Sequence, residues 1–260
     1  MRLPVPLLLC CLLTLAGCAP RGTVDEGAAT PPEPAPTGTA GEPPEAAGEL
    51  PACDPQPFAL EGYEVKVAEN ADLDGDGQDE CIVGCQGATV DEVGEPTDPA
   101  YFTLAHYADG EWQEWFSIPA PGDERFVDEE SVVAAEDLND DGIVELALQF
   151  YGFGVSSRPQ TLYVWQITDD GSESAIQGDA VAATSDDGLL VQDIDDRWPG
   201  QELVFAIAQM GDEAHAAPHR YKIVVYGWKD ALYRKVATAT PARKFAGHGA
   251  ALEAYVGNPH

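Results

Sequence analysis

The apolar positions after residue 53 are concentrated in short runs, and three of these runs directly follow a loop rich in aspartate and glycine. The three runs cover residues 81–85, 146–150 and 203–208. Short apolar runs that begin at turn residues are typical of β-strands. We find no segment of useful length with the spacing of an amphipathic helix. The pattern therefore predicts an all-β domain.

The regions after these runs contain further strands and turns. In each region a second strand ends in aromatic residues, at His106-Tyr107, Tyr163-Val164-Trp165 and Tyr226-Gly227-Trp228. Asp109-Gly110 and Asp170-Gly171 are hairpin-turn dipeptides, and residues 112–118 and 232–237 supply fourth strands. A repeat of roughly 40–60 residues with four strands has the size of a propeller blade. We predict a β-propeller-like array of about three to four antiparallel four-stranded blades.

The number of blades is open at this stage. Three repeats are fewer than the roughly four to eight blades of a closed propeller. Residues 58–67 and 245–256 either add strands of a fourth, irregular blade or leave an open arc of three blades. An open arc needs a partner or charged edges to avoid pairing between exposed strands.

The loops before the apolar runs share a spacing of oxygen-bearing side chains. Loop one (residues 72–80) and loop two (residues 137–145) carry oxygens at positions 1, 3 and 5, glycine at 6 and glutamate at 9. Ca²⁺ takes six to eight oxygen ligands, and short side chains at alternate positions of a tight loop converge on one point. Position 7 offers a backbone carbonyl. The expected ligands are Asp72, Asp74, Asp76, Gln78 and Glu80 in loop one, and Asp137, Asn139, Asp141, Ile143 and Glu145 in loop two.

An EF-hand differs from these loops in two ways. It requires a bidentate glutamate at position 12 and flanking helices, whereas position 12 is Val83 in loop one and Leu148 in loop two. The loops instead resemble the FG-GAP or VCBS-type repeat of integrin-like β-propellers, which reads D-x-[DN]-x-D-G-x-x-[DE]. The resemblance covers most of residues 60–240, and it implies a calcium-braced, non-catalytic β-propeller blade.

Loop three (residues 193–202) departs from this pattern. Arg197 replaces the carboxylate at position 5, and an extra residue precedes Glu202. We expect the guanidinium to stand where the cation would lie and to pair with a neighbouring acid. The candidate acids are Asp193, Asp195 and Glu202.

The first residues of the chain have the pattern of a secretory signal. Arg2 precedes an apolar run over residues 3–15, which is too short to span a bilayer as a mature helix. Leu15-Ala16-Gly17-Cys18 resembles a bacterial lipobox. That resemblance implies removal of residues 1–17 and attachment of fatty-acyl chains such as palmitate to Cys18. Ala19 is compatible with sorting to the outer membrane in a Gram-negative source.

The segment after the lipobox has the composition of a tether. Residues 18–52 are rich in Pro, Gly, Glu, Thr and Ala and nearly lack large apolar side chains, so they cannot bury enough surface to offset their ordering entropy. Such a segment holds a domain up to about 100 Å from a membrane. The predicted organisation is therefore a signal peptide (1–17), a lipidated tether (18–52) and a β-repeat domain (53–260).

Three cysteines remain in the predicted domain. An extracytoplasmic location is oxidising, and it favours a disulfide. Cys81 and Cys85 lie on one predicted strand, about 13 Å apart at 3.3 Å per residue, which is too far for a bond. Cys53 should therefore pair with Cys81 or with Cys85.

The balance of acidic and basic residues narrows the classes of partner that the chain could bind. With 46 acidic and 13 basic residues, the chain lacks the basic surface that nucleic acids require. The acidic excess fits cation binding, a salt-rich habitat or solubility. Seven of the 13 basic residues are concentrated between positions 220 and 244.

The motifs favour a non-enzyme. We find no GxSxG motif, no P-loop and no dinucleotide fingerprint. The prediction is a membrane-anchored, calcium-binding module of the cell envelope that binds a protein or glycan ligand. Two alternatives remain: an extracytoplasmic enzyme or accessory subunit with a site in the propeller channel, and a structural envelope protein.

Overall fold

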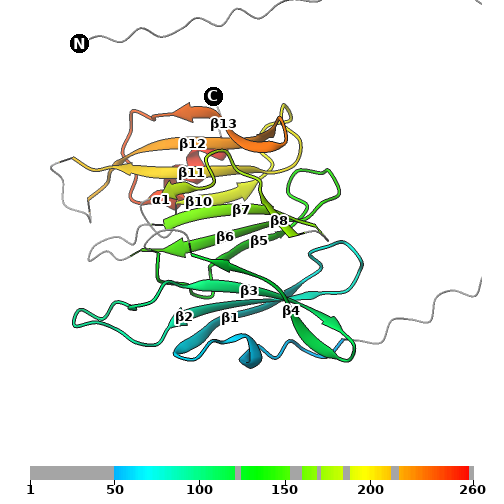
Figure 1. The fold of residues 1–260 in the computed structure, drawn as a ribbon. Helices are drawn as coiled ribbons and strands as arrows, with labels where there is room; N and C mark the ends of the chain where they lie inside the picture. Colours follow the sequence, from blue (N-terminus) through cyan, green and yellow to red (C-terminus); the bar gives the residue numbers. More distant parts are fainter. Residues whose placement is uncertain are drawn as a thin grey trace, which may run out of the picture. The chain divides into compact units, whose positions relative to one another are not determined.

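The computed structural model describes residues 50–120, 124–152, 160–168, 171–183, 188–211 and 217–257. The predicted signal peptide, Cys18 and nearly all of the predicted tether lie outside these residues. The described part forms three antiparallel sheets in chain order (Figure 1). An all-β fold is thereby confirmed, with two short helical elements in addition.

The first sheet has four strands paired in chain order: β1 (Tyr63–Ala71), β2 (Glu80–Gly87), β3 (Tyr101–Ala108) and β4 (Glu111–Pro119). The predicted turn at Asp109-Gly110 connects β3 to β4, and both residues have positive φ, of 55° and 90°. A two-residue hairpin with positive φ at both positions matches the right-handed twist of its strands, and Asp-Gly is well suited to it.

The second and third sheets repeat this arrangement. The second contains β5 (Val132–Glu136), β6 (Glu145–Tyr151), β7 (Gln160–Thr168) and β8 (Gly171–Ser174), and a fifth strand, β9 (Val181–Ala183), also pairs with β7. The third contains β10 (Leu189–Gln192), β11 (Glu202–Gln209), β12 (Arg220–Lys229) and β13 (Leu232–Ala239). The three predicted apolar runs are the second strands β2, β6 and β11, and each Asp-rich loop joins a first strand to a second.

The sheets pack face to face, which explains why their second strands are apolar throughout. Phe102 of β3 contacts Phe150 of β6 edge-on, with ring centroids 5.4 Å apart, in a core shared by the first and second sheets. On the other face of the second sheet, Val164 of β7 packs into a core with Leu203 and Phe205 of β11. Because β2, β6 and β11 are inner strands of covered sheets, side chains on both of their faces are buried.

Each end of the stack is covered by a segment outside the sheets. The outer face of the first sheet packs against residues 53–59, which include η1 (Gln56–Phe58). The outer face of the third sheet packs against α1 (His248–Val256) through Ala251 and Leu252. In the described part of the chain, no hydrophobic core combines residues of the first and third sheets, so the array is not closed.

Of the two alternatives for the ends of the domain, the fourth, irregular blade is not formed by the described residues. Residues 63–71 are the first strand of the first sheet, and residues 248–256 are the helix α1. The composition of this helix explains the difference, since Ala250, Ala251, Leu252 and Ala254 are strong helix formers. Ala251, Leu252 and Ala254 also place a small apolar face against β11 and β12.

The disulfide joins Cys53 to Cys81, with the two Cα atoms 5.7 Å apart. This confirms one of the two predicted pairings. Cys85 is a free, buried thiol on the same face of β2. The bond fastens the N-terminal covering segment to the first sheet, and Tyr101 reinforces it by donating a hydrogen bond from its hydroxyl to the Phe58 carbonyl, at 3.0 Å.

Candidate metal centres

All three Asp-rich loops end in a buried glutamate that is held in the same way. Glu80, Glu145 and Glu202 begin β2, β6 and β11, and none is more than 4% exposed. In each case Oε2 accepts a hydrogen bond from the backbone N–H of the second loop residue, at 2.7 Å from Leu73, 2.9 Å from Leu138 and 2.7 Å from Ile194. The second carboxylate oxygen, Oε1, is left available in each loop for other partners.

In loop one the backbone turns the carboxylates inward. Asp72 accepts hydrogen bonds from the N–H groups of Gly75 and Gly77, at 2.8 and 3.0 Å. Both glycines have positive φ, of 76° and 86°, a conformation that most other residues adopt only with strain. As a result, one carboxylate oxygen each from Asp72, Asp74 and Glu80 lies within 4.8 Å of the others.

This donor set suits a hard cation. Two ligands on opposite sides of a Ca²⁺ ion lie about 5 Å apart, because each metal–oxygen distance is about 2.3–2.6 Å. The 4.8 Å limit on the oxygens of Asp72, Asp74 and Glu80 is compatible with one shared ion. Asp76 and Gln78 line the small cavity of about 150 Å³ beside them. The structure therefore brings together oxygens of three of the five ligands predicted in loop one, those of Asp72, Asp74 and Glu80.

Burial and neighbouring carboxylates both act on the glutamates of loops one and two. Burial raises the pKa of Glu80 to about 7, and the charges of Asp74, Asp76 and Asp72 add to the rise. Burial likewise raises the pKa of Glu145 to about 7, with further contributions from Asp141 and Asp137. A bound divalent cation would remove this repulsion and favour the ionised carboxylates.

Loop two has the same backbone arrangement with different partners for its glutamate. Asp137 accepts hydrogen bonds from the N–H groups of Asp141 and Gly142, at 3.1 and 2.8 Å. Asn139 donates its side-chain N–H to Glu145 Oε1 at 2.6 Å. The predicted oxygen of Asn139 instead accepts from the Asp141 N–H at 2.9 Å. The backbone N–H of Ile143 donates to Asp141 at 2.9 Å.

A residue that sequence analysis missed completes loop two. Gln166 of β7 pairs directly with Glu145 in the sheet register. Its side-chain N–H group donates to Asp141 at 3.2 Å and to Glu145 at 3.1 Å. These amide donors occupy carboxylate oxygens that a metal would need, so a cation in loop two requires the side chains of Asn139 and Gln166 to turn. Only knowledge of the strand register identifies Gln166.

Loop three uses a surface ion pair and an aromatic side chain. Of the three predicted partners, Arg197 pairs with Asp195, donating from Nε to both carboxylate oxygens at 2.8 Å. The Arg197 side chain is 76% exposed, so it does not fill the space of a buried cation. Oε1 of Glu202 is buried and has no hydrogen-bond partner in the described part of the chain. In the described part of the chain, Asp193 forms neither a hydrogen bond nor an ion pair with Arg197.

Trp198 and Gly200 give loop three its own packing. A Cβ atom at Gly227 would lie 2.8 Å from the Trp198 ring, so glycine is required where the indole covers β12. A Cβ atom at Gly200 would lie 2.1 Å from the Leu138 carbonyl oxygen. The neighbouring Gln201 N–H donates to that same oxygen at 2.6 Å. Loop three therefore packs directly against loop two.

Comparisons with known proteins identify no family. No family model matches the chain, and no curated protein matches it. Two solved structures resemble it: a rhamnogalacturonan lyase of family PL11 from Bacillus licheniformis, with a TM-score of 0.42, and the rhamnogalacturonan lyase YesW, with a TM-score of 0.40. Each is 17% identical and aligns with 72% of this chain but with only 35% and 36% of its own. Neither TM-score reaches 0.5, so neither match assigns a fold or an activity.

In the part of the chain that the structure describes, no helix is long and apolar enough to cross a bilayer.

Proposed function

We propose that this chain is a calcium-stabilised, non-catalytic binding module that a lipid on Cys18 anchors to the cell envelope. The observation that carries the calcium assignment is the convergence of Asp72, Asp74 and Glu80 oxygens within 4.8 Å. The same residues were selected from sequence spacing alone. Loop two repeats the backbone arrangement, and its amide contacts lead us to assign it the weaker site.

Blade-like architecture is the second part of the proposal. Three antiparallel sheets that follow one another along the chain and pack face to face support the assignment of propeller-like blades. The covering segments at both ends support a capped three-blade array in place of a closed ring. Terminal repeats of stacked arrays need such covers because their outer faces have no neighbour.

The positions of the carboxyl groups with raised pKa values support a binding role for the domain. Burial raises the pKa of two carboxyl groups, those of Glu80 and Glu145, to about 7, and both lie in loops where a cation would neutralise them. We therefore assign them to metal binding and not to acid–base catalysis. The lipid anchor and acidic tether would present the domain outward from the membrane, towards a protein or glycan ligand.

Calcium titration of the full chain, solubilised in detergent, tests the metal assignment. We expect calcium at 100 times its dissociation constant to add about 2.7 kcal/mol of stability for each site. Asp72→Asn should abolish the tighter site, because it replaces one carboxylate oxygen and the negative charge by an amide nitrogen, and only one of the Gly75 and Gly77 amides keeps its acceptor. Glu173→Gln, an exposed change on β8 outside the loops, is the matched control. An equal calcium response in wild type and in a double Asp72→Asn, Asp137→Asn variant would disprove the proposal.

A further inference from the structure

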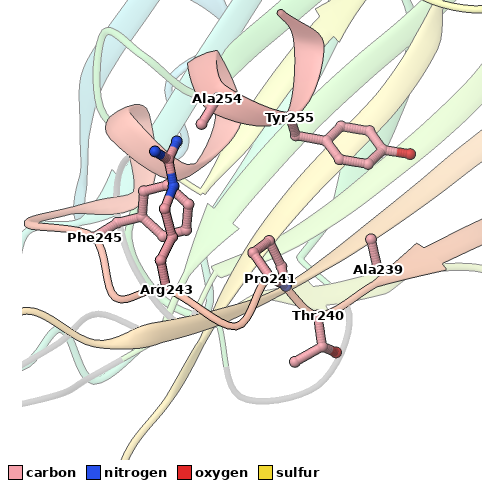
Figure 2. Close-up of a pocket in the computed structure, with 7 residues that line it drawn as sticks. All are labelled: Ala239, Thr240, Pro241, Arg243, Phe245, Ala254 and Tyr255. Atoms are coloured by element: carbon pink, nitrogen blue, oxygen red, sulfur yellow. The ribbon is translucent and has the colours of Figure 1, made fainter. Parts of the chain in front are cut away.

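A cavity lies between the C-terminal half of α1 and the chain that follows β13. Its volume is about 480 Å³, within the roughly 300–1,000 Å³ of small-molecule sites. The cavity is far from loops one and two along the chain, and the proposed calcium function does not use it. Figure 2 shows the lining residues, which are Ala239, Thr240, Pro241, Arg243, Phe245, Ala254 and Tyr255.

The only charged side chain among these lining residues is Arg243. Its guanidinium carbon lies 4.5 Å from the centroid of the Phe245 ring, and Phe245 is itself buried. This cation–π contact leaves the edges of the guanidinium free to donate hydrogen bonds. No carboxylate in the described part of the chain forms an ion pair with Arg243. Arg243 is exposed, so its guanidinium is accessible to a ligand in the cavity.

The Tyr255 ring, with its hydroxyl group, forms the opposite end of the cavity. In Figure 2 the phenol ring of Tyr255 and the guanidinium of Arg243 lie at opposite ends of the labelled group, with Pro241 between them. Burial raises the pKa of Tyr255, and the charges of Asp195 and Glu202 add to the rise. Arg197 opposes this effect only in part. A ligand with one anionic group would therefore place it at Arg243 and its uncharged body at Tyr255.

We propose that this cavity binds a small organic monocarboxylate that carries a ring, with the carboxylate on Arg243 and the ring between Pro241 and Tyr255. A planar guanidinium donates two parallel hydrogen bonds to a carboxylate. The aromatic ring of Tyr255 and the apolar ring of Pro241 suit a ring of the ligand. Arg243 is the one charged side chain among the lining residues, so the cavity offers a partner for one carboxylate and dicarboxylates are disfavoured.

The test is a calorimetric titration of the full chain in the presence of calcium. The probe is N-acetylphenylalanine, and the two comparison compounds are its uncharged amide and phenylsuccinate, a dicarboxylate. We expect binding of N-acetylphenylalanine at least about tenfold tighter than that of either comparison compound, a difference of about 1.4 kcal/mol. No binding of N-acetylphenylalanine up to about 10 mM, or equal binding of the amide, overturns the proposal.

Variants locate the site. Arg243→Gln should weaken binding of N-acetylphenylalanine at least about tenfold, and Arg243→Lys should give an intermediate loss because lysine keeps the charge without the planar fork. Arg220→Gln is the control, since Arg220 is exposed on β12 and does not line the cavity. Unchanged unfolding midpoints show that each variant is folded. Unchanged affinity of Arg243→Gln for N-acetylphenylalanine places the carboxylate elsewhere and overturns the proposal. The calcium response of the same samples tests the proposed metal loops separately.

Discussion

The stability of the calcium-free protein should fall as the pH rises from about 5 to about 8. The perturbed groups are Glu80 and Glu145, whose pKa values rise from 4.5 to about 7 in the folded state because the carboxyl groups are buried beside aspartates. A group whose pKa is raised on folding binds more protons when folded than when unfolded. Its contribution is fully present below pH 4.5 and is lost as the pH rises through 7.

The size of the effect follows from these values. One pKa unit corresponds to about 1.4 kcal/mol, so each glutamate costs the folded, calcium-free protein about 3 kcal/mol once it is ionised. The two together cost about 6 kcal/mol if the loops do not relax, and less if they open. For a domain of about 200 residues, 1 kcal/mol shifts the unfolding midpoint by about 2–4 °C. We therefore expect a fall on the order of 10 °C between pH 5 and pH 8.

Calorimetric melts across this pH range provide the assay. Calcium should be removed with a chelating resin, because carboxylate chelators themselves lose affinity as they are protonated. Saturating calcium should raise the midpoint strongly at pH 8 and weakly at pH 5. The control is the double variant Glu80→Gln, Glu145→Gln, which keeps the contribution of Glu202, whose pKa burial also raises, and the repulsion among the remaining 44 of the 46 acidic residues. A calcium-free wild type whose midpoint is the same at pH 8 as at pH 5, or higher, refutes the reasoning.

Three further predictions concern the anchor, the N-terminal cover and loop three. Cys18→Ser should move the protein from the membrane fraction to the soluble fraction, and retention in the membrane contradicts the lipid assignment. Cys53→Ser should lower the free energy of unfolding by about 3–4 kcal/mol, because the bond spans 28 residues. Denaturant titration measures this loss, and a change below about 1 kcal/mol would exclude a stabilising role. Arg197→Ala should cost under about 1 kcal/mol because its ion pair is exposed, whereas Trp198→Ala should cost about 3 kcal/mol, with or without calcium; equal losses contradict this assignment.

Much of the fold follows from local sequence because the loops and the inner strands carry strong signals. Strands β2, β6 and β11 are continuous apolar runs, since both of their faces are covered. The Asp109-Gly110 hairpin needs only two residues of suitable conformation. Each of these features depends on neighbours along the chain, and each was predicted. The helix α1 was missed because it is short and has glycine at its N-cap with no side-chain cap.

The candidate sites could be predicted only as far as one segment contains them. The five predicted ligands of loop one lie within nine consecutive residues, so the convergence of Asp72, Asp74 and Glu80 is a local property. Gln166 reaches loop two from another strand, and its role depends on the register that pairs it with Glu145. The choice of Cys81 over Cys85 also lies beyond local reasoning, because both face residues 53–59 from the same side of β2.

The covering segments at the two ends explain how three sheets can be stable without closing into a ring. A closed propeller buries the outer face of its first blade against its last, whereas here residues 53–59 cover one outer face and α1 covers the other. The disulfide holds the first cover in place from Cys53, a position next to the predicted tether. Force applied through the tether would therefore reach β2 through a covalent bond before it reaches loop one.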